Sequence, residues 1–405
     1  MKIYENNAEC CGCSACESVC PQKIIKMLPT EYDGFSYPVI EDDDKCLGCN
    51  LCVKVCPMKH PEKQECEKSF YAGITNDKNI WKESTSGGVF TEICKLYSHK
   101  NPVIFGARWD EKIEVLMDYC EGVNLMTPFR KSKYVAAKSN GMFYVAKRFL
   151  EEGRVVIFSG TPCQIAGLKN YLRKDYDNLV TIDFACHGQG SPLVFDKWKK
   201  HLEKKYKSKL TRFKFRERKY IGDFLNSNCT GYEFENGKQV TVNRDYYHHA
   251  FVYGFHMREC CGSCKFSKHL YADITLADFK SPQQSKFIDS HENATDVVAN
   301  TDKGKTICNS LKETIRMFDA NYTEELRYNP KLYMTLNGNP ERVNFMKDIN
   351  KGIPVDTVIK KYAMIMPTQW GGYNLPLKYY RILWPLLSVM DTVVNRTHKL
   401  IRKLL

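Results

Sequence analysis

Long apolar runs are missing from this sequence. No stretch of about 18 consecutive apolar residues occurs, so no bilayer-spanning helix is expected. The residues that follow Met1 also lack the apolar core of a secretory signal. We therefore expect a cytoplasmic protein, in a reducing compartment where most of its 19 cysteines stay free of disulfides.

A nucleic-acid-binding motif is also missing, although the net charge is +13. We ascribe the charge to a solvated surface with local basic patches, and we expect no nucleic-acid partner. The hydrophobic share of 43% is ordinary for a globular protein, and 405 residues are enough for two or three domains.

Two cysteine runs with the same spacing dominate the first 60 residues. Each follows the pattern C-x2-C-x2-C-x3-C-P, with which bacterial two-cluster ferredoxins bind [4Fe–4S] clusters. In those proteins the fourth cysteine of each run ligates the other cluster. Zinc is the alternative, but a zinc site needs no second run with a crossed Cys-Pro. The first predicted set is Cys10, Cys13, Cys16 and Cys56, and the second is Cys46, Cys49, Cys52 and Cys20.

Between the two runs, apolar residues flank Asp33-Gly34, which predicts a hairpin. Residues 81–195 then alternate between strand and helix patterns. Strands at 154–160 and 179–184 each run into a cysteine-containing loop. Ligands of open α/β sheets bind where such loops converge. Residues 211–245 are β-rich, a last core strand is expected near 297–300, and the remainder is mostly helical.

Four further cysteines are distinguished by their context. Cys163 and Cys186 follow strands, and Cys261 and Cys264 form a C-x2-C pair. We predict that these four ligate a third [4Fe–4S] cluster. The alternatives are a zinc C-x2-C site with two buried cysteines, or a reducible disulfide. Four other cysteines lie in apolar or ordinary sequence patterns, which indicates that they are packing residues. They are Cys94, Cys120, Cys229 and Cys308.

A small-residue loop, Ser86-Gly87-Gly88, opens a predicted helix. Free N–H groups at such a position bind phosphate, and a tight turn is the alternative. His187, beside Cys186, is a candidate for tuning or protonating a cofactor, and Asp278 at a strand end is a second candidate catalytic residue. A structural role is the alternative for both.

Several ordered motifs together resemble a known family, over roughly residues 1–310. The chain is similar to the coenzyme F420 hydrogenase/dehydrogenase beta subunit family, with the fused N-terminal ferredoxin domain of members from bacterial polysaccharide-synthesis loci. The motifs are Ser84–Phe90, Ser132–Val135, Ser159–Leu168, Asp183–Gly188, and Cys261-x-x-Cys264 followed by Ala272–Phe279.

The resemblance implies an iron–sulfur flavoprotein. FAD is expected beside the third cluster, and coenzyme F420 is a candidate substrate that exchanges hydride with the flavin. The residues expected around FAD are Ser86, Gly87, Gly88, Lys133, Tyr134, Gly160, Thr161, Pro162 and Gln164.

The expected fold is α+β. It comprises a two-cluster ferredoxin-like domain at 1–62 and a mixed α/β flavoprotein-type core at 70–195. The core continues as a β-rich part at 196–310, and a helical extension follows at 311–405. Residues 386–405 predict an amphipathic helix. The apolar face of this helix would either contact a membrane surface peripherally or pack on its own domain.

These features predict a flavin-dependent oxidoreductase that relays electrons through its clusters to FAD, which exchanges hydride with coenzyme F420 or an organic substrate. The expected partner is a redox protein or a small hydride donor or acceptor. The alternative is a non-catalytic electron-transfer subunit or adaptor that feeds a partner enzyme, with polysaccharide biosynthesis as its setting.

Overall fold

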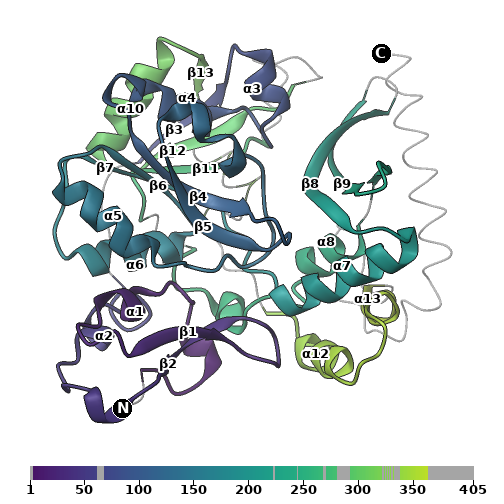
Figure 1. The fold of residues 1–405 in the computed structure, drawn as a ribbon. Coiled ribbons are helices and arrows are strands. Elements are labelled where there is room, and N and C mark those ends of the chain that lie inside the picture. The colour runs from purple at the N-terminus through teal and green to yellow at the C-terminus, as the bar shows by residue number, and fades with distance from the viewer. Residues whose placement is uncertain are drawn as a thin grey trace.

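The computed structural model describes residues 3–61, 68–221, 224–243, 245–267, 271–280, 292–321 and 338–363, together with residues 323, 325, 327, 329 and 332 (Figure 1). The amphipathic helix predicted at 386–405 lies outside these residues. In the part that is described, no helix is both long enough and apolar enough to cross a membrane.

A small N-terminal unit is built around the predicted hairpin. Strands β1 and β2 pair antiparallel, from Ile25 opposite Ile40 to Pro29 opposite Ser36. In the turn, Asp33 Oδ1 accepts hydrogen bonds from Thr30 Oγ1 at 2.6 Å and from the Phe35 N–H at 3.2 Å. The hairpin prediction is confirmed. The elements are η1 (Asn7–Glu9), α1 (Ala15–Val19), β1 (Ile25–Pro29), β2 (Ser36–Ile40), η2 (Asp43–Lys45) and α2 (Leu51–Lys54).

An eight-stranded mixed sheet forms the centre of the molecule, in the order β13-β3-β12-β11-β7-β6-β4-β5. Strands β4, β6, β7 and β11 are parallel to one another, and the other neighbouring pairs are antiparallel. The carboxyl ends of the parallel strands therefore meet at one edge. The strands are β3 (Ser69–Ile74), β4 (Val103–Trp109), β5 (Val115–Glu121), β6 (Val156–Ser159), β7 (Leu179–Phe184), β11 (Ile274–Asp278), β12 (Thr295–Ala299) and β13 (Arg316–Asp319).

Helices cover both faces of this sheet because its strands alternate apolar side chains between two cores. Phe105 and Phe158 pack with helices α5 and α6, whereas Ile104 and Ile157 pack with α4 and α10. The helices around the sheet are α3 (Lys78–Lys82), α4 (Val89–Leu96), α5 (Met142–Glu151), α6 (Pro162–Leu172) and α10 (Asp302–Lys312), with the short turns η3 (Ser98–Lys100), η4 (Val123–Leu125) and η5 (Thr127–Phe129).

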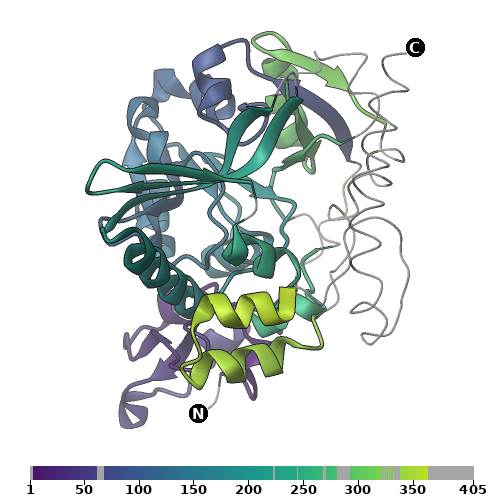
Figure 2. The same ribbon diagram turned by 90° about the vertical axis from the view of Figure 1, so that its right-hand side faces the viewer.

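A separate layer stands beside the sheet (Figures 1 and 2). Three antiparallel strands in the order β10-β9-β8 pack their aromatic residues, among them Phe213 and Tyr232, against a group of helices. A turn at Asn236-Gly237 joins β9 to β10, with φ of 79° at Gly237. The elements are α7 (Pro192–Tyr206), β8 (Leu210–Ile221), β9 (Phe224–Phe234), β10 (Gln239–Val242), α8 (Tyr246–Val252), η6 (Glu259–Ser263), α12 (Arg342–Asn350) and α13 (Val355–Ala363).

One expectation about the sheet is wrong. The strand predicted near 297–300 is β12, but it is not the last strand of the core, because β13 follows it and pairs with β3. Strand β13 has four residues and a half-exposed side-chain pattern. A short edge strand of this kind carries too few apolar residues to be separated from the helical pattern around it.

Candidate redox site

The first predicted cluster set is brought together from both cysteine runs. Cys13 and Cys16 are buried. Burial raises the pKa of the Cys16 thiol, and the neighbouring thiols of Cys10 and Cys56 raise it further. Cys56, from the second run, therefore lies with the three cysteines of the first run, as crossed ligation requires.

The second predicted set lines a small cavity of its own. Apolar residues of the hairpin, Ile24, Ile25 and Ile40, form part of its wall. Cys49 is solvent-exposed, and the neighbouring Leu47 is 66% exposed. This cavity therefore lies at the surface, whereas the first set is covered by the core. The four lining cysteines are Cys20, Cys46, Cys49 and Cys52.

The third predicted set also converges on one cavity, from three separate elements. Cys163 lies in the first turn of α6, Cys186 follows β7, and Cys261 and Cys264 lie in and after η6. The thiols of Cys163 and Cys261 raise the pKa of Cys186 in addition to the effect of burial.

Two cysteines that sequence reasoning left unassigned, Cys11 and Cys260, line this third cavity. Cys11 is 3% exposed, and its thiol interacts with those of both Cys13 and Cys163. It therefore lies between the first set and the third. The only available signal was the adjacent Cys-Cys pair at 10–11 and again at 260–261.

These donor sets fit [4Fe–4S] clusters by their chemistry. Each consists of four thiols, and mutual repulsion between their thiolates would be relieved by bound iron. Within the ranges that the structure describes, no three His, Cys, Asp or Glu side chains form a group that could hold a single metal ion. Each iron of a cubane takes a different thiolate, so cubane ligands lie farther apart than the ligands of one ion.

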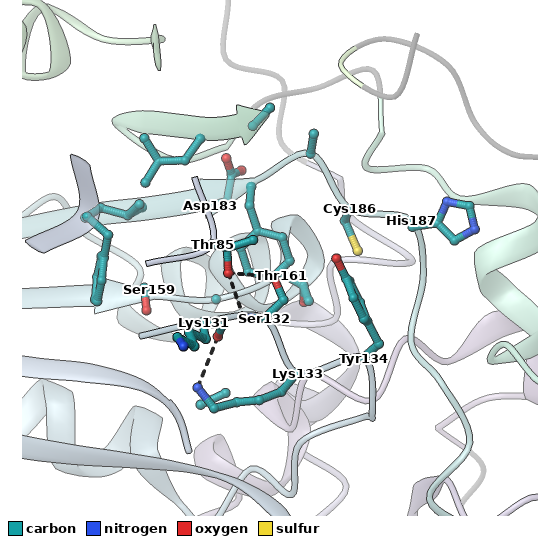
Figure 3. A pocket seen from close by; sticks show the side chains of 18 of the residues that line it. Thr85, Lys131, Ser132, Lys133, Tyr134, Ser159, Thr161, Asp183, Cys186 and His187 are labelled. Carbon is teal, nitrogen blue, oxygen red and sulfur yellow. Dashed lines mark hydrogen bonds between the residues drawn. The ribbon is translucent and has the colours of Figure 1, made fainter. Parts of the chain in front are cut away.

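A much larger pocket, with a volume of about 350 Å³, opens beside the third cavity (Figure 3). The six residues from Phe184 to Gln189 line both spaces. The pocket lies at the carboxyl ends of β6, β7 and β11, where the sequence placed the ligand loops. Of the residues expected around FAD, those that line it are Ser86, Gly88, Lys133, Tyr134, Gly160, Thr161 and Gln164. Pro162 lines the third cavity instead.

Gly87 does not line this pocket. A glycine is required at this position because the backbone is packed closely against other parts of the protein. Its N–H donates to Thr295 Oγ1 at 2.7 Å, and its carbonyl accepts from the Thr75 N–H at 2.8 Å. A Cβ at this position would lie 2.8 Å from the Thr295 nitrogen. The Gly87 amide is thus committed within the protein, whereas Gly88, with φ of 85°, caps α4 and faces the pocket.

Lys133 and Tyr134 are held by neighbouring groups. Lys133 Nζ donates to the carbonyls of Arg130 at 2.7 Å and Lys131 at 3.2 Å, and desolvation lowers the pKa of Lys133 to about 7. The ring of Tyr134 stacks on His248, with centroids 4.8 Å apart, and on Phe251 at 5.1 Å.

The two candidate catalytic residues are both bonded to other parts of the protein. His187 Nε2 is 2.7 Å from the carbonyl oxygen of Val252, and Figure 3 shows its ring apart from the other labelled side chains. Asp278 Oδ2 accepts from Arg216 Nη1 at 2.6 Å. Both residues nevertheless line the pocket. Their placement favours orienting roles over direct proton transfer.

A buried carboxyl group that sequence reasoning did not single out also lines the pocket. Asp183, at the end of β7, is fully buried, and desolvation raises its pKa to about 7. Thr275 Oγ1 donates to its Oδ1, while Oδ2 has no hydrogen-bond partner among the described residues. Only the tertiary environment distinguishes this aspartate from an ordinary one.

The cysteine-rich unit is joined to the core by Arg258 and Gln189. Arg258 is 3% exposed, and its guanidinium donates to the carbonyls of Cys10 at 3.1 Å and Ser36 at 2.8 Å. Gln189 accepts from Arg258 Nε at 3.1 Å and donates to the Cys11 carbonyl at 3.0 Å. On α6, a Cβ on Gly167 would lie 2.7 Å from Cys13 Sγ, so the contact there is also close.

Two family models match separate parts of the chain. Residues 9–60 match the model of the 4Fe-4S dicluster domain, and residues 153–322 match the model of the C terminus of the coenzyme F420 hydrogenase/dehydrogenase beta subunit. A chain in the xenon-derivatised F420-reducing [NiFe] hydrogenase complex from Methanosarcina barkeri is similar, with a TM-score of 0.45 and 15% identity. The match covers 72% of this chain and 91% of that chain. No curated protein matches the chain.

Proposed function

We propose that this protein is an iron–sulfur flavoprotein oxidoreductase. The chain joins a region that matches the 4Fe-4S dicluster domain to a region that matches the C terminus of the coenzyme F420 hydrogenase/dehydrogenase beta subunit. The coarser statement, an iron–sulfur electron-transfer protein of oxidoreductase type, follows from the family alone. The proposal adds a third [4Fe–4S] cluster, FAD in the large pocket, and hydride exchange with coenzyme F420 or an organic substrate.

The observation that carries the proposal is the shared wall between the third cysteine cavity and the large pocket. One short segment, Phe184–Gln189, contributes to both. Cys186 is one of the four candidate ligands and also lines the pocket. A cluster bound by this set would therefore lie beside any molecule in the pocket, as electron transfer between the two requires.

The pocket suits a phosphate-containing cofactor. Its volume lies within the range of ligand sites, roughly 300–1,000 Å³. Gly88 and Thr161 are the N-caps of α4 and α6, and both line it, so the positive ends of two helix dipoles face the space. When bound, FAD would supply the conversion between single electrons and hydride.

The first cysteine set would connect the surface with this centre. Cys49 of the second set is exposed, and Cys11 contacts both Cys13 and Cys163. The proposed order of clusters is therefore second, first, third, and then the pocket. The exposed second set favours a redox protein as the partner, which also suits the alternative of an electron-transfer subunit or adaptor without catalysis of its own.

Anaerobic purification followed by iron, sulfide and flavin analysis tests the proposal. We expect about twelve iron atoms, four for each of three clusters, and about one FAD per chain. Cys186→Ala is expected to lose about four of the irons. Cys120→Ala is the matched control, because Cys120 is also partly buried but lies outside all three cavities.

Two results would contradict parts of the proposal. About eight irons per chain without flavin would remove both the third cluster and the flavoprotein assignment. Full iron and flavin content, without reduction of either coenzyme F420 or an artificial two-electron acceptor, would favour the electron-transfer subunit instead.

A further inference from the structure

Arg216 has an unusual backbone conformation for a residue in a strand. It lies in β8 with φ of 59°, in the left-handed region that residues with a Cβ rarely adopt. The pairing of β8 with β9 shifts register between Lys214 and Glu217, which indicates a bulge at this point. Bulges of this kind redirect a side chain, and strained residues persist where the surrounding structure holds them.

The redirected side chain lines the large pocket and is almost completely enclosed. It is 11% exposed, and Nη1 donates to Asp278 Oδ2 at 2.6 Å. Its Nε is buried and has no hydrogen-bond partner among the described residues. A buried donor without an acceptor is destabilising, so its presence in a pocket indicates that a ligand supplies the acceptor.

The charge of the pocket identifies the chemistry of that ligand. Its lining includes five basic side chains and two aspartates, one of which is Asp183 with its raised pKa. Lys131 is already paired with Glu217 at 2.8 Å, Arg216 with Asp278 at 2.6 Å, and desolvation lowers the pKa of Lys133 to about 7, so Arg130 and Lys280 are the remaining positive groups. The remaining balance is positive and favours an anion. The basic residues are Arg130, Lys131, Lys133, Arg216 and Lys280.

Arg216 also approaches the pocket from a different layer than the residues expected around the cofactor. The loops after β6 and β7 follow strands of the eight-stranded sheet, whereas Arg216 belongs to β8 of the separate three-stranded sheet (Figure 1). Asp278 bonds Nη1 and Tyr134 also bonds the Arg216 side chain, so the guanidinium is oriented while Nε is left without a partner among the described residues. A fixed, planar donor of this kind is suited to carboxylate and phosphate oxygens.

We propose that Arg216 binds an anionic oxygen, from a carboxylate or phosphate, of the substrate that enters this pocket. The inference deepens the proposed function by naming the class of substrate, and it rests on the pocket being the site of hydride exchange. Arg216 would then be a specificity-determining residue, with Asp278 as the residue that positions it.

The experiment compares Arg216→Gln and Arg216→Lys with Arg218→Gln in the anaerobically purified full chain. Arg218 lies two residues further along β8 and donates to the carbonyls of Trp81 and Ser86, yet it does not line the pocket. It therefore controls for loss of contacts between β8 and the core. Inorganic phosphate and malonate serve as probes, and their affinities are measured by calorimetry alongside the FAD content of each variant.

We expect Arg216→Gln to weaken the binding of at least one probe about tenfold or more, with Arg216→Lys intermediate and Arg218→Gln equal to the wild type. FAD content should be the same in all four proteins. Equal probe affinity in Arg216→Gln and the wild type would overturn the inference. Loss of FAD confined to the Arg216 variants would also overturn it, because the anion would then belong to the cofactor. If the wild type carries no FAD, the proposed function fails by itself, and the probe affinities still test Arg216.

Discussion

Replacement of Arg258 by Met should loosen the cysteine-rich unit from the core. The substitution leaves three acceptors without their donor, namely the carbonyls of Cys10 and Ser36 and the side-chain oxygen of Gln189. It also removes a cation 4.8 Å from the Phe35 ring centroid and 4.6 Å from that of Tyr37. The methionine side chain retains part of the buried volume but offers no donor.

The free-energy cost of Arg258→Met can be worked out from the three buried acceptors that lose their donor. A buried acceptor left without a partner costs about 1–3 kcal/mol. For three of them we take the lower end, about 3 kcal/mol in total, because water reaches some of the groups once the contact loosens. That free energy corresponds to roughly a 100-fold increase in the equilibrium constant for opening of this interface.

Hydrogen exchange read by mass spectrometry is the appropriate assay, because a chain with several domains and cofactors has no single unfolding transition. Amides within residues 10–37 should exchange roughly 100-fold faster in Arg258→Met, and those of α10 should be unchanged. Lys265→Met is the matched control. Lys265 also donates to a carbonyl of the unit, that of Met58 at 2.9 Å, but it is exposed, so its loss should cost less than about 1 kcal/mol.

Equal exchange rates over residues 10–37 in Arg258→Met and Lys265→Met would refute the role of Arg258 in holding the cysteine-rich unit on the core. Iron content is measured in the same samples, so that loss of a cluster is not mistaken for loss of the interface. A faster rate that appears only in iron-depleted protein would also count against the argument.

Two further predictions concern buried positions around the site. Gly167→Ala should destabilise the contact between α6 and the cysteine-rich unit by about 1–3 kcal/mol, because its Cβ would lie 2.7 Å from Cys13 Sγ; unchanged amide exchange in α6 and unchanged iron content would contradict this close contact. The pKa of Lys133 falls from about 10.4 in an unfolded chain to about 7 in the folded protein, so the unfolded chain binds more protons between these values. The free energy of local opening around Lys133 should therefore rise with pH from 7 to 9 in the wild type, as measured by hydrogen exchange corrected for the intrinsic rate at each pH, and Lys133→Met should reduce that rise; an equal rise in both proteins would argue against a neutral Lys133.

Much of the architecture was readable because it rests on local patterns. The strands at 156–159 and 179–184 are short, mainly apolar runs bounded by turn residues, and such runs specify buried strands with little help from elsewhere. The edge strand β13 was missed because a four-residue, half-exposed strand depends on its partner β3 for its existence.

The sequence by itself determined the three sets of candidate ligands. A cluster takes several of its thiolates from a few consecutive residues, so cysteine spacing already carries the geometry of the site. It also determined which loops meet at the ligand-binding edge, because each of them follows a parallel strand.

Only the tertiary structure decided what surrounds those ligands. Cys11 and Cys260 reach the third cavity, Arg258 joins the two units, and Arg216 enters the pocket through a bulge on a separate sheet. Nothing in the neighbouring residues marks Arg258 or Arg216, and Cys11 and Cys260 are marked only by the cysteine next to each of them. Each of these residues matters because it is buried against residues that are distant in the sequence. Such contacts form only when the chain folds.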